Sequence, residues 1–233
     1  MENKQLKKEV QQLVKKYSLD IIRIDGLSCK FKSAGFQSLI FMNQQKKELG
    51  WLQYSYVSNR YSEVGSVFGF SVCEGFRMNE FSIRDVPEQF KLLRLLTECD
   101  LSYKNRCIVS DCYFGFSSLN TLREYFYNKG TVSIFKNDNV DEKIKQVVVK
   151  INEIYIPRIV RFLYGNLDLL NDILEYPHNF GYPLATALAV CKLNDRTDLF
   201  STILERSKSI ERMQLEVENL TEIYSKLNIN VSE

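Results

Sequence analysis

The 233-residue chain has few of the residues on which catalysis and irregular structure depend. It contains one histidine, four prolines and ten glycines, whereas 45% of its residues are hydrophobic. This balance excludes a disordered or collagen-like chain. A chain of this length buries on the order of 70% of its unfolded surface, so it needs no disulfide or metal to hold a core. One domain or two small domains fit this length.

The chain also has almost no net charge. Its 31 Lys and Arg residues against 29 Asp and Glu residues give +2, which is too little for the long-range field that attracts a phosphate backbone. Nucleic-acid binding is therefore disfavoured. One basic cluster lies in the first segment, at Lys4, Lys7, Lys8, Lys15 and Lys16. It could contact membrane or nucleic acid, but the solvated face of an ordinary helix is favoured because no Trp or Phe accompanies it.

Long hydrophobic runs are absent as well. No run approaches the roughly 18 residues that a membrane span needs, and the first segment is too charged for a signal peptide. We therefore expect a cytoplasmic protein without membrane association, whose six cysteines are reduced. None of them forms a Cys-x2-Cys pair and His178 has no cysteine at ligand spacing, so we expect no metal and no cofactor. Cys29, Cys73 and Cys191 continue apolar patterns and are predicted to pack in the core.

The first part of the chain alternates between one helix and several strand-like runs. Leu6, Val10 and Val14 share one face at 3.6 residues per turn, which predicts a helix over residues 3 to 17. Asp25-Gly26 suits a hairpin turn between strands 22–24 and 27–31. Further strands are predicted over 36–43, 50–58, 65–73 and 106–116, and short helices over 88–98 and 118–127, the first of them covering the sheet. Short connections favour an antiparallel meander.

From residue 139 onward the pattern is helical. Asn139 followed by Glu142 is typical of a capping box at the start of a long helix, and Pro157 is predicted to kink that helix or restart it. Further helices are predicted over 167–174, 184–192 and 199–205, with a turn from 176 to 183. Apolar residues from Ile210 to Leu227 recur at steps of three and four. They extend over only about two and a half heptads, so docking on the chain's own helices is favoured over a homo-oligomer formed through residues 209–227.

These patterns together predict an α+β fold. It would have an N-terminal helix, an antiparallel meander sheet covered by helices, and an all-helical C-terminal part. The predicted boundary separates a sheet-containing part, residues 1–138, from a helical part, residues 139–233, and the two would pack as one unit. A short helical array in the second part stays open as an alternative. Its two last helix pairs can be aligned with each other, although only loosely.

Motifs that carry chemistry are missing. His178 is the one imidazole available to activate a nucleophile, and neither a Gly-x-Ser-x-Gly elbow nor a phosphate-binding glycine loop occurs. We therefore predict no enzyme activity and no catalytic residues. Asp138, Asp141 and Glu142 could hold a hard cation, but negative charge is also favoured at a helix N-terminus, and that interpretation is preferred. A carboxylate or cysteine site assembled only in three dimensions stays open as an alternative.

Aromatic residues gather in one stretch of the sequence. Trp51, Tyr54, Tyr56 and Tyr61 lie close together with Arg60 beside them, and these residue types dominate protein interfaces. Tyr54, Tyr56, Arg60 and Tyr61 are therefore the candidate partner-binding residues. The competing interpretation, a tyrosine-rich sheet packed under helices, is favoured.

The order of these elements resembles a known type of domain. A lysine-rich N-terminal helix, the turn FKSAGF, the strands GWLQYSYV and VFGFSV, and the later IYIPRIVRFLYG follow one another over residues 1 to 175. This arrangement is similar to bacterial uncharacterised domains whose members sit beside toxin genes and are regarded as candidate immunity proteins. Those relatives have a GFKKKG-like turn, of which Lys32 and Gly35 are retained here while the lysine run is absent.

The resemblance implies a non-enzymatic protein that binds one cognate toxin or effector and neutralises it. No catalytic residue is attributed to such domains, so none is carried over to this chain. If the toxin were a nuclease, an acidic docking patch would be expected. The alternative is an adaptor or nucleic-acid-associated regulator that uses the basic helix or the terminal heptads.

Overall fold

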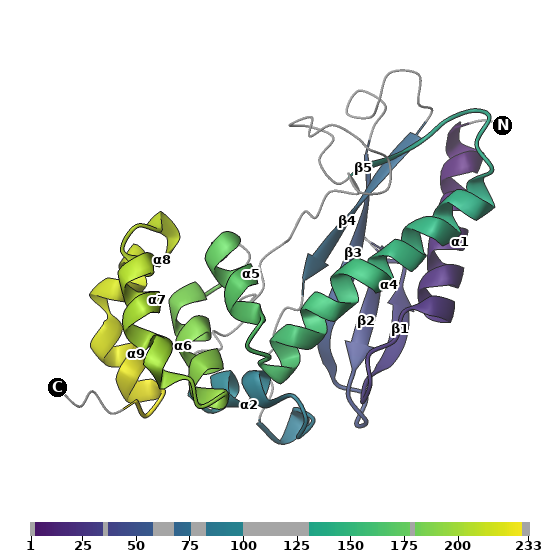
Figure 1. Cartoon of the computed structure of the whole chain (residues 1–233). Coiled ribbons are helices and arrows are strands. Elements are labelled where there is room, and N and C mark those ends of the chain that lie inside the picture. The colour runs from purple at the N-terminus through teal and green to yellow at the C-terminus, as the bar shows by residue number, and fades with distance from the viewer. Residues whose placement is uncertain are drawn as a thin grey trace. The chain divides into compact units, whose positions relative to one another are not determined.

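The structure, a computed structural model, describes residues 3–34, 37–57, 68–75, 83–99, 131–177 and 180–229. The fold is α+β, as predicted (Figure 1). Its described elements form two compact units. Unit 1 contains α1 (Asn3–Ile21), a five-stranded sheet, and α4 (Val140–Tyr164) as far as Pro157. Unit 2 contains the rest of α4 and all the other described helices. The strand predicted over 106–116 and the helix over 118–127 lie outside the described residues.

The sheet of unit 1 is an antiparallel meander. Its strands follow one another in sequence order: β1 (Ser28–Lys32), β2 (Gln37–Met42), β3 (Glu48–Val57), β4 (Phe68–Gly75) and β5 (Thr131–Ile134). Phe31 lies opposite Leu39, which lies opposite Leu52, so these three side chains share one face of the sheet. A register shift between Phe41 and Met42 marks a bulge. The predicted meander is confirmed.

Helices α1 and α4 lie over the sheet (Figure 1). Each helix buries one apolar stripe, which explains why both form where the 3.6-residue period predicted them. The buried residues of α1 are Leu6, Val10, Val14 and Tyr17, and those of α4 within unit 1 include Ile144, Val147, Val148 and Ile151. Complete burial of one such aliphatic side chain contributes roughly 1.5–3 kcal/mol.

The predicted hairpin at Asp25-Gly26 is wrong in its first strand. Helix α1 continues to Ile21, and Ile22 and Ile24 are buried without forming a strand. The turn itself is present, because the Leu27 N–H donates to the Ile24 carbonyl at 3.0 Å and Gly26 adopts a φ of 82°. The two isoleucines therefore alternate because both enter the core after the helix, and not because the backbone is paired.

Unit 2 is built around one buried helix. Every residue from Pro183 to Cys191 in α6 (Pro183–Leu193) is buried, and α6 contacts α2 (Lys91–Glu98), α5 (Leu169–Glu175), α7 (Phe200–Ser207) and α8 (Glu211–Glu218). The remaining described elements are α9 (Leu220–Lys226) and the short 3-10 helices η2 (Ile83–Asp85) and η4 (Thr197–Leu199). Helix α2 packs on α6 within unit 2, and its predicted role as a cover of the sheet stays a prediction.

A glycine ends the long helix α4 at a crowded point of unit 2. Gly165 has a φ of +75°, a region that side chains rarely adopt. A Cβ built there would lie 2.9 Å from both Leu92 Cβ and Leu193 Cδ1. The position therefore requires glycine for its backbone angle and for close approach of the neighbouring helices.

Pro157 lies inside one continuous helix. Helix α4 extends from Val140 to Tyr164 and does not restart as a second segment, whereas the alternative prediction of a kink stays a prediction. The division between the compact units falls at this proline, and the predicted ranges 1–138 and 139–233 stay a prediction.

The terminal apolar repeat is divided between two short helices, α8 and α9, which meet at Asn219. Helix α8 packs on α6 and α7, and both Met213 and Leu227 are fully buried. The docking interpretation is thus confirmed for these positions, whereas a homo-oligomer through residues 209–227 stays a prediction.

Candidate functional site

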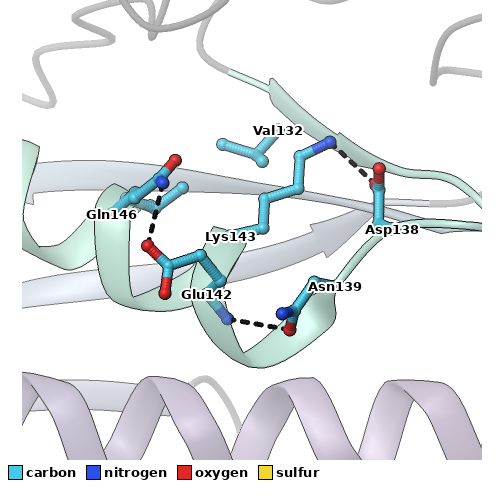
Figure 2. Close-up of a pocket in the computed structure, with 7 residues that line it drawn as sticks. Val132, Asp138, Asn139, Glu142, Lys143 and Gln146 are labelled. Carbon is cyan, nitrogen blue, oxygen red and sulfur yellow. Dashed lines mark hydrogen bonds and ion pairs between the residues drawn. The ribbon is translucent and has the colours of Figure 1, made fainter.

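A pocket of about 250 Å³ lies in unit 1 where α4 begins beside β5. It is lined by Val132, Asp138, Asn139, Glu142, Lys143, Gln146 and Val147 (Figure 2). Lys143 Nζ lies 2.8 Å from Asp138 Oδ2. The Glu142 N–H donates to Asn139 Oδ1 at 3.3 Å, which is the N-cap bond that the sequence predicted. Gln146 Nε2 donates to Glu142 Oε1 at 3.0 Å. The polar groups of this pocket are therefore paired with one another.

The three carboxylates considered for a cation have separate partners. Asp138 accepts the Phe135 N–H at 2.7 Å in addition to its pair with Lys143. Asp141 accepts the Tyr17 hydroxyl of α1 at 2.8 Å, and this bond raises the pKa of Tyr17. Among the described residues, no group of three or more His, Cys, Asp or Glu side chains is placed to hold a metal ion. The geometry fits the helix N-terminus interpretation.

Tyr54 lies in the interior of unit 1. Its side chain is 0% exposed, its hydroxyl forms a 2.7 Å hydrogen bond with Ser18 Oγ of α1, and its ring stacks on Phe31 with a centroid separation of 6.0 Å. Burial raises the pKa of Tyr54, so the phenol is neutral. A partner that binds the folded unit cannot reach this side chain. The favoured interpretation, a tyrosine packed under a helix, is therefore the one that the structure supports at this position.

Tyr56 is half-buried on the same strand and also connects the sheet to α1. Its hydroxyl donates to Gln37 Oε1, and Gln37 Nε2 donates to the Gln11 carbonyl of α1 at 3.4 Å. Lys7 Nζ lies 5.7 Å from the centre of the Tyr56 ring. The partner-binding role of Tyr56 stays a prediction, and Arg60 and Tyr61, like His178, lie outside the described residues.

The exposed side of α1 is basic. This helix contains five lysines and two acidic residues, Glu9 and Asp20. The exposed lysines are Lys4, Lys7, Lys8, Lys15 and Lys16. At 3.6 residues per turn, Lys4, Lys8 and Lys15 fall within ~40° of one another around the helix axis. We call these three residues the lysine stripe; none of them forms an ion pair with another residue that the structure describes.

The charge excess is local to unit 1. Its described residues include 14 Lys and Arg against 9 Asp and Glu, whereas those of unit 2 include 11 and 13. The near-neutral total therefore conceals a basic unit. The sequence showed the lysines but could not show that the apolar face of their helix is covered by the sheet.

A buried carboxylate in unit 2 was missed at the sequence level. Glu216 of α8 is 9% exposed, and its oxygens accept the Leu184 N–H at 3.3 Å and the Ala185 N–H at 2.9 Å. Both donors belong to the first turn of α6, where Tyr182 provides no side-chain cap. Burial raises the pKa of Glu216 to about 7, although the two N–H donors and Arg212 act in the opposite direction. The available signal was a charged residue three positions after Met213, inside an apolar stripe.

The cysteines whose side chains the structure describes are Cys29, Cys99 and Cys191, and none of the three is exposed, whereas the predicted core position of Cys73 lies outside the described side chains. Cys191 is fully buried, as predicted, and burial raises the pKa of its thiol to about 11. Cys29 and Cys99 are half-buried, and burial also raises the pKa of each. A raised pKa reduces the thiolate fraction that a nucleophile needs.

No protein-family model, no curated protein and no solved structure matches this chain. In the part of the chain that the structure describes, every helix is too short or too polar to cross a bilayer. The resemblance to candidate immunity proteins stays a prediction.

Proposed function

We propose that this chain is a non-enzymatic binding protein that recognises a cognate protein, a toxin or effector, and neutralises it. The observation that carries the proposal is the exposed lysine surface of α1, held on a helix whose other side is fixed to the sheet. A local positive surface on a rigid support speeds association with a complementary partner and disfavours partners of like charge.

The internal bonding of unit 1 supports this assignment. The polar groups of the pocket pair with one another, and Tyr54 and Tyr56 connect α1 to the sheet. The paired groups of the pocket and the two tyrosines thus stabilise the unit that carries the exposed lysines. The tyrosines would serve binding indirectly, by positioning the helix.

The test is co-purification of the tagged full chain with the product of the adjacent gene, followed by a growth assay. Expression of the adjacent gene alone should arrest growth, and co-expression of this chain should restore it. Absence of both a stable complex and growth rescue would refute the proposal. Substrate turnover by the purified chain, abolished by one carboxylate or thiol replacement, would also refute it.

The same lysine surface favours one alternative function, a nucleic-acid-associated regulator. A protein that neutralises phosphates loses affinity steeply with salt, with a slope of log K against log salt near −0.9 per phosphate contact. Binding of the purified chain to a short DNA duplex with a slope of roughly −4 or steeper would select this alternative.

A further inference from the structure

We infer that the partner docks on the lysine stripe of α1, formed by Lys4, Lys8 and Lys15, and presents an acidic protein surface to it. This inference rests on the proposed function and deepens it by naming the surface and the chemistry of the partner. All three lysines are exposed, and they lie on α1, which is labelled in Figure 1. At 1.5 Å rise per residue it extends over ~16 Å, a length that fits within one side of a standard protein interface.

The backbone that carries the stripe is held on its opposite side. Val10 and Val14 are fully buried. In the last turns of the helix, Ser18 bonds to Tyr54 at 2.7 Å and Tyr17 donates to Asp141 at 2.8 Å. The helix is thus attached both to the sheet and to α4. Because the support is preorganised, binding has to order only the lysine side chains, which limits its entropic cost.

A lipid surface does not fit this helix. An amphipathic helix binds a membrane by inserting its apolar face below the headgroups. In α1 that face, which includes Leu6, Val10 and Val14, is already buried in unit 1. The lysines could approach anionic lipid, but these buried apolar residues are not available to insert with them.

An acidic protein surface also fits better than a nucleic acid. Helix α1 contains no arginine, the side chain whose planar fork binds phosphate in a bidentate manner, and it carries Glu9 and Asp20. The whole chain has a net charge of only +2. A long polyanion responds to the charge of a large surface, whereas a folded protein can match one local patch.

The experiment compares two variants with equal change in charge. K4E/K8E/K15E reverses the stripe, and K91E/K136E/K145E reverses three other exposed lysines. A third variant, K4Q/K8Q/K15Q, removes the positive charge without adding repulsion. Far-UV circular dichroism should show the same spectrum for all variants and the parent chain. Binding to the co-purified product of the adjacent gene is then measured by surface plasmon resonance at low and high salt.

We expect the stripe reversal to slow association by about tenfold or more at low salt, with a smaller loss for the glutamine variant and less than about twofold change for the control. The loss should shrink as salt screens the charges. Equal association rates for the stripe and control variants would overturn the inference while leaving the proposed function intact.

Two further probes complete the test. A short DNA duplex and vesicles containing phosphatidylserine should bind the parent chain more weakly than the protein partner does. Stripe-dependent binding that is tighter to either probe would overturn the inference in favour of that partner class. Failure to obtain any complex or growth rescue would refute the proposed function, and the inference with it.

Discussion

Glu216 provides the most quantitative prediction for unit 2. Its carboxyl group caps the first turn of α6 from a different helix, through the N–H groups of Leu184 and Ala185. Among the charged groups of α8 and its neighbours, Arg212 lowers the pKa of Glu216. The nearby ion pairs Glu205–Lys208 and Glu222–Lys226 lie at the surface. Burial therefore dominates, and the folded unit holds the Glu216 proton more tightly than the unfolded chain does.

The expected magnitude follows from the raised pKa. The pKa of Glu216 rises from the ordinary 4.5 to about 7, and each pH unit of difference corresponds to about 1.36 kcal/mol, so ionisation removes roughly 3 kcal/mol of folding stability. Because the pKa is higher in the folded state than in the unfolded chain, protonation of Glu216 stabilises the fold. The contribution is fully present below pH 4.5 and is lost as the pH rises through about 7.

The assay is urea unfolding of the parent chain and of Glu216→Gln, followed by far-UV circular dichroism from about pH 4.5 to about pH 8. Other titrating groups are common to both proteins and cancel in the difference. The free energy of unfolding of the parent minus that of the variant should fall by roughly 3 kcal/mol across this range. A constant difference would show that the N–H donors balance burial, and a difference that increases with pH would show that they outweigh it. Either result would refute the reasoning.

Further predictions concern both units. Glu216→Ala removes the acceptor of two buried N–H groups and leaves a void, so it should destabilise the protein by ~2–4 kcal/mol in urea unfolding, whereas a change below about 0.5 kcal/mol would exclude a capping role. Tyr54→Phe removes the buried bond to Ser18 and should cost ~1–2 kcal/mol, with little further loss in the double variant with Ser18→Ala; additive losses would contradict the pairing. Gly165→Ala should cost ~2–4 kcal/mol and lower the thermal midpoint, because it combines a strained φ with overpacking; an unchanged midpoint would contradict the geometry. Cys191 should resist iodoacetamide at about pH 8 until the protein is unfolded, as read by peptide mass spectrometry; labelling in the folded state would contradict its burial.

Much of the local structure could be predicted from the sequence. The stripe of Leu6, Val10 and Val14 predicted α1, and the Asn139–Glu142 pattern predicted the start of α4 and its N-cap bond. The residues that form each of these features lie within one or two helical turns of one another. A short stretch of sequence therefore contains every residue that the prediction needs. The same locality explains the error at Ile22 and Ile24, since alternating burial looks identical whether or not a second strand pairs with it.

The role of the tyrosines could not be predicted to the same depth. Tyr54 and Tyr56 belong to a residue type that is enriched in protein interfaces. Whether such a side chain faces a partner or its own helix depends on what covers the strand. Packing of α1 places Ser18 against Tyr54 across 36 positions of the chain, so the side chain of Tyr54 faces its own helix.

The sequence by itself determined the α+β class, the principal described helices and strands, and the position of the lysines, because periodicity and charge are properties of neighbouring residues. Tertiary structure alone decided that the apolar side of α1 is covered, that Glu216 caps a helix 31 to 32 residues away, and that the compact units divide at Pro157. The physical reason is that burial, pKa and hydrogen-bond pairing depend on groups brought together by packing, and the order of residues does not contain those distances.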